Sequence, residues 1–279
     1  MSLEAKTLRW TSPTDIDDAI HVNGIRDFPF DHEGLLDSMI KMTTQLIFSR
    51  ERPHNTTPIL NAINRWRDEN RFHSAEEAQT ILRELLQKIV TQRWNEVEAM
   101  ESAWLDHLAS TRICCFCAKP DNIAAWERFG DKHKGIALRF KSSETAGTQS
   151  PKQVGYQKER AYLTTLKEQL STMLYNRPVD VVKRYDEQLL KKSHHLKAED
   201  EWRCIRSAPK SSSENGIAHD DLPFDTEDLS GIYFGVGTPE LTKEKFQKVA
   251  KKRFPKAALY QIKLANNNFA LDIEKIETQ

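Results

Sequence analysis

Residues 113–140 read ICCFCAKPDNIAAWERFGDKHKGIALRF, and this stretch sets the expected fold class. Its apolar beginning, 113–117, has the composition of a β-strand, and the alternation in 136–140 predicts a second strand. Between the two, Asp121 or Asn122 can cap a short helix that ends at a glycine. The stretch therefore predicts a compact strand–helix–strand unit with a polar turn before its second strand.

The composition is that of a globular protein with a well-charged surface. Of the 279 residues, 38% are hydrophobic and 29% are charged, and 41 basic residues balance 41 acidic ones. This balance removes any general electrostatic attraction to nucleic acid or to acidic membranes, although a local patch remains possible. No apolar run approaches the roughly 20 residues that span a bilayer. We expect a cytoplasmic protein without a membrane partner.

The four cysteines predict structural thiols. Cys114, Cys115 and Cys117 lie in one predicted strand, too close together for a disulfide framework, and Cys204 stands alone. Their spacing does not match a zinc site either. We therefore expect four buried thiols, with Cys115 and Cys117 on one face of the strand.

The whole chain predicts one α+β domain over 1–279, built on a single mixed sheet with two helical insertions. The insertions are expected at 33–110 and 158–196, with a break in the first near Gln92–Glu96. Residues 208–221 are rich in Ser, Asp, Asn and Gly and predict a loop. The expected strands lie near 8–10, 113–117, 135–140, 201–207, 230–235, 257–264 and 269–276.

Four segments together resemble a bacterial family known as domain of unknown function 2971. They are Ser12-Pro13 with Asp17-Asp18-Ala19-Ile20, then Cys115-Phe116-Cys117 with Trp126, Phe129-Gly130 and His133-Lys134-Gly135, then Lys192 with Leu196 and Glu199-Asp200-Glu201-Trp202-Arg203, and finally Gly231-Ile232-Tyr233-Phe234-Gly235. Ala19, Ile20 and Leu196 depart from the family pattern, and the family's first strand has no counterpart ahead of Leu8. The segment order is similar to that of ADP-ribosyltransferase-like toxins and abortive-infection proteins of phage defence, which is an analogy of layout only.

The strongest candidate for chemistry is the alternation of Glu199, Glu201 and Arg203. On a strand all three side chains would leave one face, and Arg203 would help to keep both carboxylates ionised. In ADP-ribosyl transfer, one carboxylate of such a pair holds the ribose hydroxyl and the other orients the acceptor, while both stabilise positive charge in the transition state. The alternative is an exposed strand face with an ordinary salt bridge.

The turn after the predicted helix is the second candidate. Trp126, His133, Lys134 and Gly135 could stack a base and hold a phosphate, and the resemblance adds Ser12 and Lys192 as substrate-binding residues. The alternative is a core tryptophan followed by a solvated turn. We expect Trp126 and Phe129 to be buried and the turn to lie at the rim of a cleft.

Three functions remain open at this point. The first is a nucleotide-dependent transferase that uses Glu201 and Glu199, with NAD as its cofactor. The second is a non-catalytic module that binds a protein or nucleic acid, which the missing first strand favours. The third is a metal-dependent nuclease or hydrolase using Asp17, Asp18 and Glu201, although the spacing of these residues forms no recognised metal motif.

The transferase hypothesis makes a further prediction about Glu201. This residue should lie partly buried in a cleft near His133 or Lys134, with Arg203 as its support. Glu201→Gln should then abolish nucleotide turnover and leave the melting temperature nearly unchanged.

Overall fold

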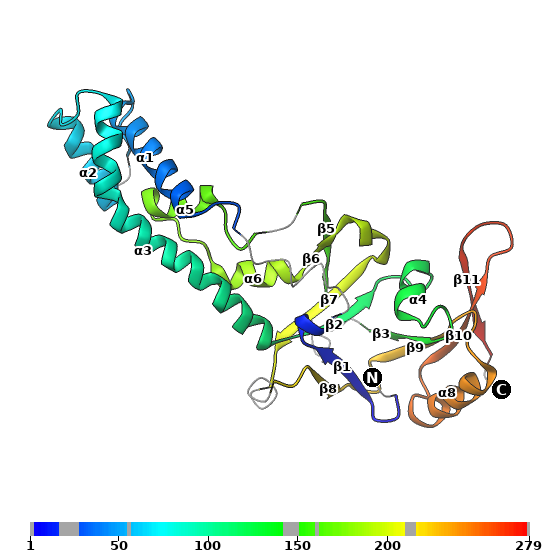
Figure 1. The fold of residues 1–279 in the computed structure, drawn as a ribbon. Coiled ribbons are helices and arrows are strands. Elements are labelled where there is room, and N and C mark those ends of the chain that lie inside the picture. The colour runs from blue at the N-terminus through cyan, green and yellow to red at the C-terminus, as the bar shows by residue number, and fades with distance from the viewer. Residues whose placement is uncertain are drawn as a thin grey trace. The chain divides into compact units, whose positions relative to one another are not determined.

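The computed structural model describes residues 3–16, 28–54, 57–141, 151–159, 162–209 and 216–277 (Figure 1). The chain separates into two compact units, each made of several segments. Unit 1 comprises Met1–Val22, Leu108–Glu159 and Leu189–Gln279, and unit 2 comprises Asn23–His107 and Arg160–Gln188. The single domain over 1–279 stays a prediction.

Unit 2 is helical, and the signals that start its helices are visible in the sequence. The side chain of Asp31 accepts from the Gly34 amide at 2.7 Å, and Thr165 and Glu168 form a reciprocal capping box. Apolar side chains from 35–47, 60–63, 78–90 and 170–174 then pack into one core. The helices are α1 (His32–Phe48), α2 (Pro58–Asp68), α3 (Ala75–Ala109, which continues into unit 1), α5 (Leu166–Tyr175) and α6 (Val181–Leu189).

Two expectations for the helical insertions are wrong. α3 runs unbroken for 35 residues, because Gln92–Glu96 contains neither glycine nor proline to interrupt the backbone hydrogen bonds. The second insertion is shorter than the predicted 158–196. Its first helix begins at Leu166, and the end of the predicted helix forms a short strand, β6 (Lys191–Ser193), and a 3₁₀ helix, η2 (His194–Glu199).

Unit 1 is mixed α+β, but it contains three sheets among the described residues, so the predicted single sheet is wrong. The first sheet has the order β4-β7-β2-β1-β8, the second β11-β10-β9-β3 and the third β5-β6. The strands of the first are β1 (Thr7–Thr11), β2 (Thr111–Cys117), β4 (Lys152–Gln153), β7 (Glu201–Ser207) and β8 (His219–Pro223). Those of the others are β3 (Ile136–Phe140), β9 (Leu229–Phe234), β10 (Ala258–Leu264), β11 (Leu271–Ile276) and β5 (Gly155–Gln157).

The chain changes sheet between β2 and β3, at the helix α4 (Ile123–Phe129) and the turn that follows it. Asp131, Lys132 and His133 all have positive φ, between 49° and 64°, which bends the backbone sharply. β3 therefore pairs with β9 and not with β2, its neighbour in the sequence. The first two sheets meet in one hydrophobic core, against which the helix α8 (Glu240–Arg253) also packs.

All seven predicted strands are present, with ends within two residues of the expected positions. β8 was missed, because it lies in the segment predicted as a loop. It forms antiparallel to β1, where Arg9 pairs with Asp221 at 3.1 Å, and Arg112 of β2 pairs with Asp220 at 2.7 Å.

Candidate functional site

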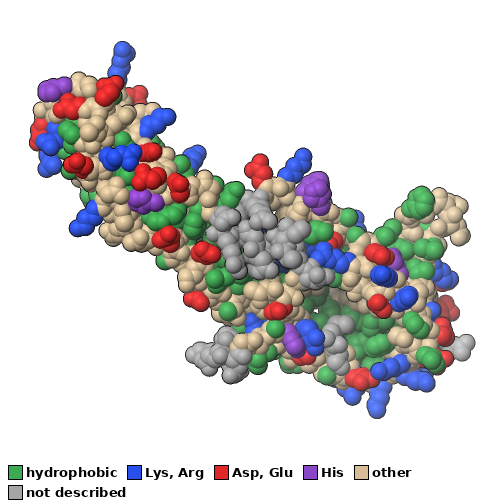
Figure 2. Space-filling model, in the orientation of Figure 1, with side chains coloured by type: hydrophobic (Ala, Val, Ile, Leu, Met, Phe, Trp, Pro, Cys, Tyr) green, Lys and Arg blue, Asp and Glu red, His purple; other side chains and the backbone are tan. Residues whose placement is uncertain are grey.

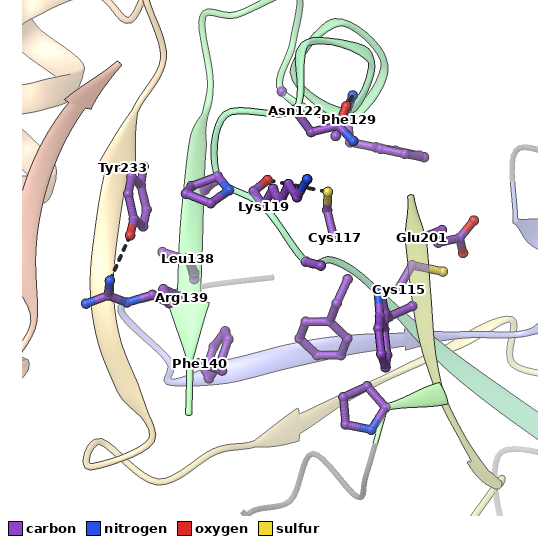
Figure 3. Close-up of a pocket in the computed structure, with 18 of the residues that line it drawn as sticks. Cys115, Cys117, Lys119, Asn122, Phe129, Leu138, Arg139, Phe140, Glu201 and Tyr233 are labelled. Atoms are coloured by element: carbon purple, nitrogen blue, oxygen red, sulfur yellow. Dashed lines mark hydrogen bonds between the residues drawn. The ribbon is translucent and has the colours of Figure 1, made fainter. Parts of the chain in front are cut away.

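A cavity of about 740 Å³ lies within unit 1, between β3 and the ends of β2 and β7. In Figure 3, Leu138 and Phe140 stand on one side of the hollow and Cys115 and Glu201 on the other, while the Arg139 side chain reaches toward Tyr233. Hydrophobic side chains also gather around a hollow in this region of the molecular surface (Figure 2). The cavity brings together the candidate carboxylates, the predicted helix and strand β3.

Asn122 positions the helix at one end of this cavity. Its side-chain oxygen accepts from the Ala125 amide at 2.9 Å and so caps α4. Its side-chain nitrogen donates to the backbone oxygens of Ala198 and Glu199, at 2.9 and 3.1 Å. One side chain therefore both starts α4 and ties it to η2, next to the carboxylates.

The aromatic residues of α4 behave differently from each other. Trp126 is 4% exposed, and its ring nitrogen donates to the Pro120 oxygen at 2.6 Å, as expected for a core residue. Phe129 is 58% exposed and lines the cavity, so the expectation that it is buried is wrong. The helix is only seven residues long, and one side of it packs on the protein while Phe129 remains uncovered.

The turn at 131–135 packs against the protein. The Gly237 amide donates to the His133 oxygen at 2.9 Å, and the Gly235 amide donates to the Gly135 oxygen at 3.1 Å. A Cβ atom on Gly235 would stand 2.3 Å from the His133 oxygen, so this close approach requires glycine. His133 stacks on Trp126, and none of His133, Lys134 and Gly135 lines the cavity. These contacts support the structural alternative for this turn.

The two candidate carboxylates converge on one buried lysine. The Lys192 ammonium lies 2.6 Å from Glu199 and 2.9 Å from Glu201, and Arg203 Nε donates to Glu201 at 2.6 Å. Arg128 of α4 forms an ion pair with Glu199. Lys192, Glu199, Glu201 and Arg203 are each at least 95% buried, and the Arg128 side chain is 26% exposed. They form what we call the buried charge cluster: Lys192, Glu199, Glu201, Arg203 and Arg128.

The geometry of this cluster differs from the expected strand face. Glu201 begins β7, but Glu199 ends η2, and Asp200 between them adopts the left-handed conformation with φ 45°. The two carboxylates therefore do not alternate along one strand. They are held together because Lys192 pairs with both of them.

The charge cluster also shifts the pKa values of Glu201 and Lys192. Burial raises the pKa of Glu201, but the hydrogen bond and charge of Arg203, together with the charge of Lys192, outweigh it and lower the pKa to about 2. Burial lowers the pKa of Lys192. The charge of Glu201 and the hydrogen bonds to Glu199 and Glu201 have the larger effect, so the pKa of Lys192 is raised. Glu201 thus stays ionised at neutral pH and has its oxygens occupied by protein donors, which makes it a poor general acid or base.

The cysteines divide into two kinds. Cys114 and Cys204 are buried and face each other across β2 and β7, as expected for structural thiols. Cys115 is exposed as a residue and Cys117 is half-buried, and both line the cavity, so the expectation that all four are buried is wrong for these two. Burial of the Cys115 sulfur among surrounding protein atoms, and then the charge of Glu201, raise the pKa of the Cys115 thiol well above its ordinary value. Cys115 is therefore protonated at neutral pH.

Ser12, another predicted substrate-binding residue, lies apart from the cavity lining. Ser12 is buried, with its amide donating to the Ala218 oxygen at 2.7 Å and its hydroxyl 2.9 Å from that of Thr14. Asp17 and Asp18 fall outside the described residues. Within the part of the chain that the structure describes, no group of three or more His, Cys, Asp or Glu side chains is placed to hold a metal ion.

Sequence reasoning missed four cations in the cavity lining: Arg9, which pairs with Asp221, and three others, Lys119, Arg139 and Lys141. Arg139 donates to the Ser230 hydroxyl and the Tyr233 hydroxyl, both at 3.0 Å. Among the described residues, no carboxylate forms a salt bridge with any of the three. In the sequence they look like ordinary surface residues, and only the approach of β3 to the end of β2 brings them together.

Comparison with known proteins identifies a family for part of the chain. Residues 125–204 match the family model described as "Protein of unknown function (DUF2971)". The predicted resemblance is thereby confirmed over this segment, which contains the whole buried charge cluster. No curated protein and no solved structure matches the chain. The ADP-ribosyltransferase-like layout stays a prediction.

Across the described helices, none combines the length and the apolar character needed to cross a membrane.

Proposed function

We propose that unit 1 binds a small anionic molecule that carries a flat aromatic group, the chemistry of a nucleotide. One observation carries this proposal: the same cavity is lined by aromatic rings and by cations. Among the described residues, no carboxylate forms a salt bridge with these cations. A volume of about 740 Å³ falls in the range of ligand pockets, about 300–1,000 Å³.

The aromatic part of the ligand has several possible partners in the lining. Phe116 and Phe140 meet edge to face, with ring centroids 6.3 Å apart, and both line the cavity. The exposed ring of Phe129 stands at the same cavity, with the Arg128 guanidinium 5.4 Å from its centroid. A flat ligand that covers Phe129 would remove apolar surface from water and gain a stacking contact.

The charge of the lining favours an anion. Glu199 and Glu201 also line the cavity, but Lys192, Arg203 and Arg128 already neutralise them. The uncompensated charges are then those of Lys119, Arg139 and Lys141. A phosphate or carboxylate group on the ligand would form charge-assisted hydrogen bonds with these three exposed cations.

The proposal is one of binding, with the buried charge cluster in a positioning role. A transfer reaction of the ADP-ribosyl type needs a carboxylate that is free to contact the ribose, and the oxygens of Glu201 already accept from Lys192 and Arg203. NAD remains one of the nucleotides to test, since it carries both an aromatic base and phosphates.

Titration of the protein with AMP, ATP and NAD by isothermal calorimetry tests the proposal. We expect saturable binding of at least one nucleotide, about tenfold weaker in Arg139→Ala, because a charge-assisted hydrogen bond contributes about 1.5–3 kcal/mol. Arg9→Ala is the matched control. Arg9 lines the same cavity but is paired with Asp221 at 3.1 Å, so its loss should change the affinity little. Absence of binding at millimolar nucleotide, or an equal effect of the two substitutions in folded protein, would refute the proposal.

A further inference from the structure

Strand β3 has one open edge. It is the last strand in the order β11-β10-β9-β3, so among the described residues it pairs with β9 alone. An unpaired strand edge presents a row of backbone donors and acceptors, which proteins normally cover or use. The identity of the groups on this edge follows from the pairing register.

The register assigns the backbone of Leu138 to the open edge. Gly135 lies opposite Gly235, and the Gly235 amide donates to the Gly135 oxygen at 3.1 Å, so this is a hydrogen-bonded pair. Hydrogen-bonded and non-bonded pairs alternate along antiparallel strands. Ala137, opposite Tyr233, therefore bonds to β9, whereas the N–H and C=O groups of Leu138 point the other way.

The open edge faces the cavity. Residues Ile136 to Phe140 all line it. In Figure 3, the strand that carries Leu138 has Tyr233 and its strand on one side and the hollow on the other. The N–H and C=O groups of Leu138 thus stand at an apolar cavity, where a backbone group without a hydrogen-bond partner is costly.

We infer that the ligand's flat group pairs with the backbone of Leu138 through an adjacent hydrogen-bond donor and acceptor. This inference rests on the proposed function and names the ligand class more narrowly: a nucleobase, or a heteroaromatic ring with the same edge. Leu138 lies two residues before Phe140 on β3, so their side chains leave the same face of the strand. The pairing edge and an aromatic ring are therefore supplied by neighbouring residues of one strand.

The first test uses nucleotides that differ only at the pairing edge. The tightest binder among AMP, GMP, CMP and UMP is compared with its analogue methylated on the base-pairing edge, which keeps the ring, the ribose and the phosphate. We expect the methylated analogue to bind about tenfold more weakly. Equal affinities would overturn the inference while leaving the proposed function intact, whereas failure of all four nucleotides to bind would overturn the proposed function itself.

The second test measures amide hydrogen exchange in the unmodified protein. The Leu138 N–H should exchange at least tenfold more slowly when the nucleotide is saturating. Ala137 is the matched control, because its N–H is already bonded to β9 and its exchange should not change. Bound nucleotide without added protection of Leu138 would place the ligand elsewhere in the cavity and would refute the pairing.

Discussion

Glu201→Gln distinguishes a structural carboxylate from a catalytic one. The catalytic hypothesis expects the substitution to leave stability nearly unchanged, since glutamine has the same shape. The structure leads to the opposite expectation. Glu201 accepts from Lys192 and Arg203 while 4% exposed, and a neutral amide would leave these two buried cations with one carboxylate fewer. Removing one partner of a buried ion pair is strongly destabilising.

The magnitude follows from the pKa of Glu201. A fall from the ordinary 4.5 to about 2 corresponds to about 3 kcal/mol of folding stability, at about 1.4 kcal/mol for each pKa unit. Because the folded-state pKa is lowered, this stability is present above pH 4.5 and is lost as the pH falls toward 2. The difference between the wild type and Glu201→Gln should therefore be about 3 kcal/mol at pH 6 and about 2 kcal/mol at pH 3.5.

Urea denaturation at these two pH values, followed by circular dichroism, measures both quantities. Glu227→Gln is the control, because Glu227 pairs with Lys256 at 2.6 Å on the surface, with 57% and 72% of the two side chains exposed. Such a pair contributes about 1 kcal/mol or less. A loss below 1 kcal/mol in Glu201→Gln at pH 6, or a loss that is the same at pH 3.5, would refute the structural role of this carboxylate.

Two further predictions concern the turn and the cavity thiol. Gly235→Ala should lower the free energy of unfolding by about 1–3 kcal/mol or more, because the added Cβ would stand 2.3 Å from the His133 oxygen. In the control Gly155→Ala, the added Cβ makes only an ordinary 3.8 Å contact, so the loss should be smaller. Thermal unfolding of the two variants measures the difference. Cys115 should react with iodoacetamide at pH 8 more slowly than free cysteine does, because its pKa is raised; peptide mapping by mass spectrometry measures this, and a rate equal to that of free cysteine would contradict it.

The local structure of this chain could be predicted from the sequence, and the pairing of its strands could not. The sequence predicts a strand at 201–207, and β7 spans those residues. The sheet to which a strand belongs depends on contacts far apart in the sequence. Residues 113–117 and 136–140 read as one compact unit, yet β2 and β3 lie in different sheets because three consecutive residues of positive φ turn the chain between them.

The sequence predicted only part of the candidate site, because the remaining contacts join residues that no local pattern connects. The sequence pointed to Glu199, Glu201 and Arg203 as an interacting group, and the structure brings them together, but around Lys192 and not along one strand face. The lysine had been assigned to substrate binding. Its partners lie seven and nine residues away in a 3₁₀ helix and a strand, and no periodic pattern links those positions.

In the proposed function, the buried charge cluster allows a cavity that contains two carboxylates to favour an anion. Its five members come from β6, η2, β7 and α4, so it joins the elements that form one wall of the cavity. Hydrophobic residues of similar size could hold such a wall with equal stability, because desolvation offsets most of the attraction in a buried ion pair. Stability alone therefore does not account for the cluster. Its second effect is electrostatic: once Glu199 and Glu201 are neutralised, Arg139 and the lysines of the lining determine the sign of the potential that a ligand meets.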